Sequence, residues 1–436
     1  MITSNKMSNK KIGLWSSTSL VVGNMIGSGV FLLPASLAVF GSISLFGWIF
    51  SSIGAVLLAL VFGKLAKLAP DTIGGPYAYT RLGFGDFPAY LVAWGYWISI
   101  WSTNAAIAVA FVGYMNVLFP VILEYKPLAI ILGLGVIWIF TWINSKPIRT
   151  VAIVQIITSL FKILPIFLVG FIGIAYINTE NFYPINISGE SNFSAITATT
   201  TLTLFAFLGM ESATVSSKFT KDASTTIKKS TMLGTLLTVI VYILSSVAIM
   251  GIVPQEILSK SSAPFADAAG VFWGDSAKFI VAIGAVIATL GALNGWILIQ
   301  GQIPMAASQD KLFPKIFGKV NGNNSPIIGI ILSSILASLL MSLNYSKSLI
   351  DAFTFMMKLS TLSVLTPYLL STLSLMILIK KDDGKVAIEK VILITSTITF
   401  CIWVIIGCGL EIIGWGLLLL AIGIPFYYTL VKNKQT

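Results

Sequence analysis

Long apolar stretches separated by short polar connectors run along almost the whole chain. A helix needs about 20 consecutive apolar residues to cross a bilayer. The pattern predicts twelve such spans, at residues 13–40, 43–68, 87–118, 127–145, 150–177, 194–217, 230–252, 276–306, 325–344, 349–378, 388–408 and 411–431. We therefore expect an all-α integral membrane protein with twelve transmembrane helices. The composition agrees, because only 10% of the residues are charged, against about 25% in soluble domains.

Two of these spans carry small, flexible residues near their middle. Span 1 contains Gly27-Ser28-Gly29, and span 6 contains Gly209, two residues before Glu211. Because spans 1 and 6 are five apart, two five-helix units would have opposite orientations in the bilayer. That is the pattern of an inverted repeat, with a substrate site at paired discontinuous helices. The alternative is that these small residues only allow neighbouring helices to pack closely.

A broken helix exposes backbone groups that lipid cannot satisfy. The N–H groups that start the second half-helix and the C=O groups that end the first have no intrahelical partner, so a cavity or a ligand must satisfy them. The N–H end carries partial positive charge and suits a carboxylate, whereas the C=O end suits an ammonium group. One break therefore matches the two ends of a zwitterionic α-amino acid.

The distribution of lysine and arginine predicts the orientation of the chain. With the N-terminus in the cytoplasm, 21 of the 27 Lys and Arg residues lie in cytoplasmic segments and four lie outside. The other two, Lys162 and Lys358, lie within spans. Cytoplasmic loops are enriched in these residues, so the terminal tails, 1–12 and 432–436, are expected in the cytoplasm. Topology thus explains the net charge of +11, which does not indicate a nucleic-acid partner.

Several kinds of chemistry are disfavoured by what the chain lacks. It has no histidine, which is the commonest metal ligand and a frequent general base, and it has no Walker motif. Its two cysteines, Cys401 and Cys408, lie on one apolar segment. We expect no metal, no cofactor and no enzymatic activity. The broken helices also favour alternating access over an open channel.

Five segments together resemble a known family. They are GNMIGSGVFLLPASL (23–37), GGPYAYTRLGFG (74–85), LFAFLGMESATV (204–215), LGALNGWILIQGQIPMAASQDKLFP (290–314) and TPYLL (366–370). In order and spacing they are similar to the basic amino acid/polyamine antiporters of the amino acid–polyamine–organocation (APC) superfamily. The resemblance implies a 5+5 inverted-repeat core at 13–378, with repeats at 13–177 and 194–378, and peripheral spans at 388–431. It also implies a bacterial inner-membrane location and a homodimer interface on the last two spans.

The resemblance also implies a substrate site between spans 1, 3, 6, 8 and 10. The residues expected around the carboxylate and amino groups of the substrate are Asn24, Met25, Gly27, Ser28, Gly29, Phe205 and Leu208. Those expected along and over its side chain are Ser99, Ile100, Asn104, Trp296 and Ser360. The family has a tryptophan at the position of Phe205. Phenylalanine offers a weaker cation–π face than tryptophan, so strict arginine selectivity is not expected.

The charged and gating residues complete the prediction. The resemblance implies a deeper gate at Tyr96, Glu211 and Tyr368, and a residue tied to the pH response at Tyr77. A charge within a span suggests a functional site, although Glu211 could also be a structural carboxylate held by hydroxyl groups. Lys162 lies near the middle of span 5. Its segment resembles that of superfamily members with a lysine in span 5, which implies that the ammonium group stands where sodium-coupled relatives bind sodium. We expect its ammonium group to bond to carbonyls just before Gly27, unless it is only a buried structural amine.

These observations predict a secondary transporter of amino acids. Its substrates are expected to be a cationic amino acid, such as arginine, lysine or ornithine, exchanged for its decarboxylated amine or for another amino acid. The alternative is a proton-coupled, sodium-independent importer of neutral or broad-range amino acids, because the charges of Glu211 and Lys162 nearly cancel.

Overall fold

The computed structural model of the protein describes residues 13–70, 74–215, 220–344, 346–383 and 387–435, and within these ranges it is all-helical, with no β-strand. Nine of the described helices are long and apolar enough to cross a membrane, or ten when one bent pair is counted as a span. The bent pair is α1 (Leu14–Met25) with α2 (Ser28–Ala38). The spans formed by one continuous helix are α3 (Ser44–Leu68), α5 (Asp86–Leu118), α7 (Lys126–Asn144), α11 (Ala223–Ile252), α14 (Asp275–Gln309), α16 (Leu349–Asp383), α17 (Ile388–Gly407) and α18 (Leu410–Gln435). The remaining span begins with α9 (Asn192–Leu204), continues through the 3₁₀ turn η4 (Phe205–Phe207) and ends in α10 (Ser212–Val215).

Two of the twelve predicted spans form shorter helices than the pattern suggested. The fifth consists of α8 (Ile148–Phe167), a π-turn η1 (Leu168–Ile172) and a 3₁₀ turn η2 (Gly173–Tyr176). Pro165 lies inside α8, and a proline removes one backbone donor from the helix ladder and kinks or breaks the helix. The ninth is α15 (Ile327–Leu343), which is 17 residues long. The sequence thus located these two segments correctly but overestimated their regular helical length.

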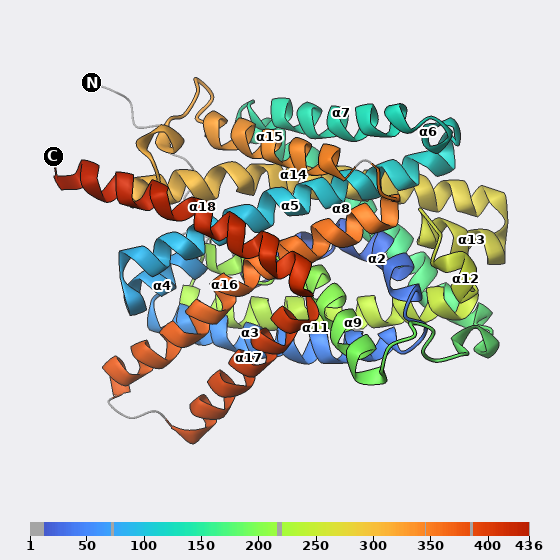
Figure 1. Ribbon diagram of the computed structural model, residues 1–436, viewed down its shortest axis with the longest axis horizontal. Coiled ribbons are helices and arrows are strands. Elements are labelled where there is room, and N and C mark those ends of the chain that lie inside the picture. The colour runs from blue at the N-terminus through green and yellow to red at the C-terminus, as the bar shows by residue number, and fades with distance from the viewer. Residues whose placement is uncertain (1–12, 71–73, 216–219, 345, 384–386, 436) are drawn as a thin grey trace.

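Short helices lie at the two ends of the bundle. One end in Figure 1 holds α4 (Pro76–Phe84), and the C-terminal end of α18 lies at the same end of the bundle. The opposite end holds α6 (Val121–Glu124), α12 (Gln255–Leu258) and α13 (Pro264–Trp273). Two further short 3₁₀ turns are η3 (Thr179–Phe182) and η6 (Lys315–Gly318).

Burial separates the central helices from the peripheral ones. In α5, 94% of the most apolar window is buried inside the protein, whereas in α18 the share is only 17%. α5 packs along α14 and α16, while α3 packs along α11 and α9. Lipid tails and a protein interior are similarly apolar, so hydropathy alone could not distinguish these two positions. The buried helices bring the two interrupted spans to the centre of the molecule.

Candidate functional site

The first interruption separates α1 from α2 by an angle of 42°. α1 ends at Met25, and Gly27 has an extended backbone at the start of α2 with no side chain capping the helix. The N-terminal N–H groups of a helix have no intrahelical acceptor. The start of α2 is therefore a site of partial positive charge inside the bundle.

The second interruption follows α9. The chain passes through the 3₁₀ turn η4, becomes extended at Leu208 and turns at Gly209, whose φ is +98°. Residues with side chains rarely adopt this φ, and a glycine adopts it at little cost. Gly209 thus allows the chain to leave one helix and enter α10 within a few residues.

The two interruptions contact each other. A Cβ atom on Gly209 would lie 3.1 Å from Cβ of Asn24, in the last turn of α1. On the other side, a Cβ atom on Gly29 would lie 3.0 Å from the ring of Phe205. A side chain at either position would crowd the other interrupted span, so the two glycines allow the spans to approach closely.

A very small cavity, with a volume of about 10 Å³, lies between the interruptions. It is lined by Asn24, Met25, Gly27, Gly29, Thr103, Phe205, Ala206, Leu208 and Trp296. None of these residues is charged, so the charge recognition available here comes from helix ends, carbonyl groups and the Phe205 and Trp296 rings. Seven of the nine were predicted to contact substrate from the sequence. The cavity brings those seven together, and their contact with a substrate stays a prediction.

Ser99, Ile100, Asn104 and Ser360 were also predicted to contact substrate, and they are not among the residues that line this cavity. Ser360 of α16 lies within hydrogen-bonding distance of the Ser99 and Thr103 hydroxyls of α5, at 3.0 Å and 2.7 Å. The Asn104 amide group donates to Oε1 of Gln300 at 2.7 Å. Ile100 is buried in α5, and the side chain of Ser28 lies outside the described part of the structure. The α5 and α16 residues therefore form a hydrogen-bonded layer beside the cavity.

Glu211 lies at the second interruption and is fully buried. The Tyr96 hydroxyl donates to its Oε1 at 2.6 Å, and the Tyr368 hydroxyl donates to its Oε2 at 2.9 Å. Within the described ranges, no lysine or arginine forms an ion pair with this carboxylate. Two neutral hydroxyls therefore connect α5, the span 6 turn and α16. Whether they act as a gate stays a prediction.

Lys162 of α8 is almost fully buried and donates a hydrogen bond from Nζ to the carbonyl of Gly23 at 2.8 Å. Gly23 lies in the last turn of α1, just before the interruption. Its contact is of the kind that the sequence suggested, because a cation suits the negative C-terminal end of a helix. Its role in sodium independence stays a prediction.

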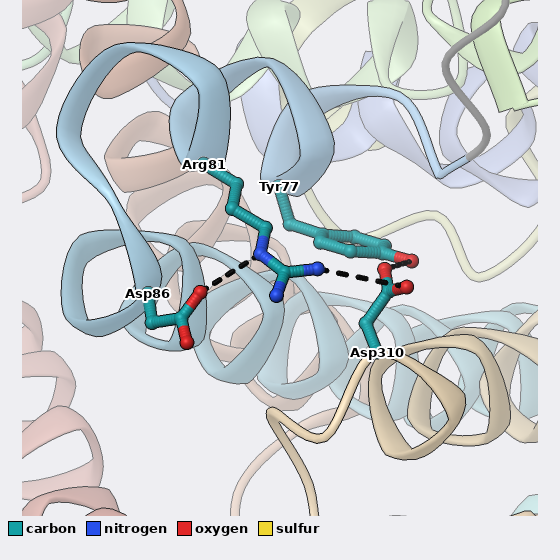
Figure 2. Close-up of polar contacts among 4 residues, drawn as sticks. All are labelled: Tyr77, Arg81, Asp86 and Asp310. Atoms are coloured by element: carbon teal, nitrogen blue, oxygen red, sulfur yellow. Dashed lines mark hydrogen bonds and ion pairs between the residues drawn. The ribbon is translucent and has the colours of Figure 1, made fainter.

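A second polar cluster lies at the end of the bundle that holds α4, and Figure 2 shows its four side chains. The Tyr77 hydroxyl donates to Oδ2 of Asp310 at 3.0 Å, where α14 ends. Arg81 lies between two carboxylates, with Nε 2.8 Å from Asp86 and Nη1 3.7 Å from Asp310. Burial raises the pKa of Tyr77 well above its usual range, and the neighbouring Asp310 raises it further. The hydroxyl therefore remains a hydrogen-bond donor at neutral pH.

Some residues of these clusters were missed by the sequence analysis. Thr103 and Ala206 line the cavity, and Gln300 holds Asn104. Thr103 lies four residues after Ser99, so helical periodicity places both on one face of the helix and could have identified Thr103. Arg81 and Asp310 lie inside the segments that carry the family resemblance, but no spacing rule indicates that they meet.

The chemistry of these residues suits binding better than bond making. In the described part of the chain, no group of three or more Cys, Asp or Glu side chains is arranged to hold a metal ion. The cavity is lined by the start of α2, by residues at the ends of α1 and α9, and by aromatic faces. These groups can bind an amine and a carboxylate at once.

Comparison with known proteins places this arrangement among transporters. Residues 12–431 match the sequence model of the family described as amino acid permease. The chain is 36% identical over 327 residues to the cadaverine/lysine antiporter of Escherichia coli (strain K12), covering 74% of this chain and 72% of that protein. It is 31% identical over 458 residues to the arginine/agmatine antiporter of Chlamydia pneumoniae, covering 100% and 93%. It is also 28% identical over 438 residues to the arginine/ornithine antiporter of Pseudomonas aeruginosa, covering 95% and 90%.

Proposed function

Because this chain belongs to the amino acid permease family, we propose that it is a secondary active transporter that exchanges cationic amino acids across a bacterial cytoplasmic membrane. Its partner substrate is the decarboxylated amine or another amino acid. The relatives named cadaverine/lysine, arginine/agmatine and arginine/ornithine antiporters support this class of substrate pair. In this proposal the protein moves its substrate without changing it chemically.

The observation that carries the proposal is the uncharged cavity between two touching helix interruptions. A substrate carboxylate would bind at the start of α2, where partial positive charge and the N–H groups of the first helical turn favour an anion. The α-ammonium group would bind at the carbonyls that end α1 and α9. The cationic end of the side chain would contact the Phe205 ring, a cation–π interaction worth about 0.5–2 kcal/mol.

Alternating access provides the transport mechanism of the proposal. Twelve spans would form a core of two inverted repeats, in which the interrupted spans 1 and 6 move against the other helices. The bonds from Tyr96 and Tyr368 to Glu211 cross between these elements, which supports a gate on one side of the cavity. The peripheral α17 and α18 would face lipid or a second copy of the chain, and both termini would lie in the cytoplasm.

The Lys162 contact supports transport that does not require sodium. Its ammonium group provides a fixed positive charge 2.8 Å from the Gly23 carbonyl, at the end of α1 where a bound cation would otherwise offset the partial negative charge. Replacing Lys162 with methionine removes that charge with little change in volume. We expect this variant to lose most exchange activity in sodium-free buffer. Wild-type transport by Lys162→Met would contradict this role.

Counterflow in proteoliposomes tests the function directly. Vesicles are loaded with radiolabelled lysine, and unlabelled arginine, lysine, ornithine, cadaverine or a neutral amino acid is added outside. We expect the cationic compounds to release the label and the neutral ones to leave it inside, with or without sodium. Equal release by leucine or alanine, driven by a pH gradient, would instead support a proton-coupled importer of broad specificity.

The Phe205 side chain tests the recognition of charge within the same assay. Phe205→Leu removes the aromatic face but keeps an apolar side chain. We expect KM for lysine and arginine to rise about threefold to tenfold, in line with the strength of a cation–π contact. Phe205→Trp should lower KM for arginine. Unchanged KM values in both variants would show that the ring does not contact the cation.

A further inference from the structure

A tyrosine on the seventh predicted span reaches both helix interruptions at once. The hydroxyl of Tyr242, in α11, lies 2.6 Å from the carbonyl oxygen of Met25 and 3.1 Å from that of Ala206. Met25 is the last residue of α1, and Ala206 lies in the turn that follows α9. Tyr242 therefore lies against the C-terminal ends of the two half-helices that face the cavity.

Aromatic neighbours fix the direction of this side chain. The Tyr242 ring is fully buried and packs against Trp48 at 5.3 Å and Phe207 at 5.6 Å between ring centres. Trp48 and Phe207 also contact each other at 6.0 Å. Rotating the tyrosine would require moving this cluster. The position of the hydroxyl is therefore set by packing and not only by its hydrogen bonds.

The Tyr242 hydroxyl can donate fewer hydrogen bonds than the two carbonyl oxygens beside it can accept. A tyrosine hydroxyl has one proton to donate, whereas each carbonyl oxygen can accept two hydrogen bonds. The proton is shared between two carbonyls, and each keeps capacity for a further donor. Both Met25 and Ala206 line the cavity, where the C-terminal ends of half-helices carry partial negative charge.

We propose that Tyr242 is a positioning residue for the amino-group subsite of the transporter. Its hydroxyl holds the Met25 and Ala206 carbonyls close together, so that one substrate ammonium group meets both. The amino acid and its decarboxylated amine share this ammonium group and differ in the carboxylate. Tyr242 thus supports the binding of both exchanged substrates equally, whereas the start of α2 binds only the amino acid, through its carboxylate. This inference rests on the proposed function.

The test combines the Tyr242→Phe variant with substrates that lack one group each. In the lysine series, cadaverine lacks the carboxylate and 6-aminohexanoate lacks the α-amino group. In the arginine series, agmatine and 5-guanidinopentanoate have the same relation. Inhibition constants against labelled counterflow are measured in wild type and variant. We expect Tyr242→Phe to raise the inhibition constants of lysine and cadaverine by a similar factor of about 5 to 20. The inhibition constant of 6-aminohexanoate should change by less than twofold.

Tyr114→Phe is the matched control. Tyr114 is also fully buried, and its hydroxyl donates to the Phe31 carbonyl of α2 at 2.8 Å, away from the cavity lining. We expect this variant to change all three inhibition constants by the same small factor.

The outcomes separate this inference from the proposed function. If Tyr242→Phe weakened the binding of all three compounds equally, or of none, the inference would be overturned. The proposed function would still stand, provided that the wild type exchanges substrates. Absence of cationic exchange by the wild type would overturn the proposed function itself. Should Tyr242→Phe fail to fold, 3-fluorotyrosine at position 242 keeps the ring and hydroxyl and makes the proton a stronger donor. In that variant the inhibition constants of lysine and cadaverine should change together, while that of 6-aminohexanoate stays the same. An equal change in all three constants, or no change, would overturn the inference.

Discussion

The protein contains two clusters in which tyrosine hydroxyls donate to a carboxylate, and they differ in their surroundings. At the centre, Glu211 is fully buried and accepts from two tyrosines. At the α4 end, Asp310 accepts from Tyr77 and lies 3.7 Å from Arg81, and its side chain is 38% exposed. The central cluster relies on neutral donors, whereas the outer one includes a cation and is partly exposed.

This difference determines how much each cluster can contribute. A buried carboxylate without its hydrogen-bond donors is costly, because hydrogen bonds to charged groups contribute about 1.5–3 kcal/mol. Exposed ion pairs contribute only about 0–1 kcal/mol and are screened by salt. The central cluster should therefore dominate both stability and transport. The outer cluster should have a smaller effect, on the free energy needed to open the transporter at the α4 end.

The largest effect is expected from Glu211→Leu. This variant leaves the Tyr96 and Tyr368 hydroxyls buried without their acceptor, and each unsatisfied group costs about 1–3 kcal/mol. We expect exchange to fall at least tenfold and the melting temperature to drop clearly, measured by counterflow and by thermal unfolding in detergent. Glu211→Gln keeps one oxygen acceptor and should lie between this variant and wild type. Wild-type exchange by Glu211→Leu would show that the central cluster has no role in transport.

The next effect in size concerns the two tyrosines of the central cluster. Tyr96→Phe removes a bond of 2.6 Å and Tyr368→Phe one of 2.9 Å. Each should lower the free energy of unfolding by about 1.5–3 kcal/mol, with the larger loss for Tyr96, whose bond is shorter. A double-mutant cycle with Glu211→Gln measures the coupling. Strictly additive losses would mean that the hydroxyls do not act through the carboxylate.

A smaller effect is expected from Asp310→Asn. Asparagine keeps an oxygen that can accept from Tyr77, while the attraction to Arg81 is lost. We expect a change of less than about 1 kcal/mol in stability and at most about a threefold change in exchange rate. The difference from wild type should shrink in roughly 0.5 M salt, where charges are strongly screened. A loss as large as that of Glu211→Leu would remove the distinction between the two clusters.

The smallest effect is expected from Arg81→Lys. Lysine keeps the charge but lacks the planar fork that lets Arg81 face Asp86 and Asp310 together. With both partners partly exposed, the expected change in stability is below about 0.5 kcal/mol. Counterflow at low and high salt should show nearly the same rate as wild type. A strong loss at low salt only would indicate that this arginine contributes more than an exposed pair does.

The sequence predicted the elements of this protein better than their contacts. Hydropathy located every long helix, and Gly27 and Gly209 marked both interruptions, because glycine is selected locally for backbone conformation and close approach. The change from α-helix to a π-turn and a 3₁₀ turn after Phe167 was not anticipated. The family resemblance, and not periodicity, indicated that Tyr96 and Tyr368 belong with Glu211.

The contacts of Tyr242 show why the sequence alone did not predict which residues meet. In its helix, Ser230, Gly234, Thr238 and Tyr242 recur at helical spacing and are buried, so small and polar residues mark the face that meets other helices. This pattern does not indicate which residues that face contacts. The tyrosine lies 217 residues from Met25, one of the carbonyls that it contacts. No local sequence pattern indicates a contact between residues so far apart in the chain. The same holds for Tyr77 and Asp310, which are 233 residues apart.

By itself, the sequence determined that the chain enters the membrane, where its helices lie and where two of them break. These properties follow from the length of apolar runs and from the backbone freedom of glycine, which are local. Only the tertiary structure decided that the two breaks touch, that Tyr242 bridges them and that Lys162 bonds to Gly23. In a membrane the hydrophobic effect does not select one helix face over another. Side-chain packing and buried hydrogen bonds make that selection, and they exist only in the assembled bundle.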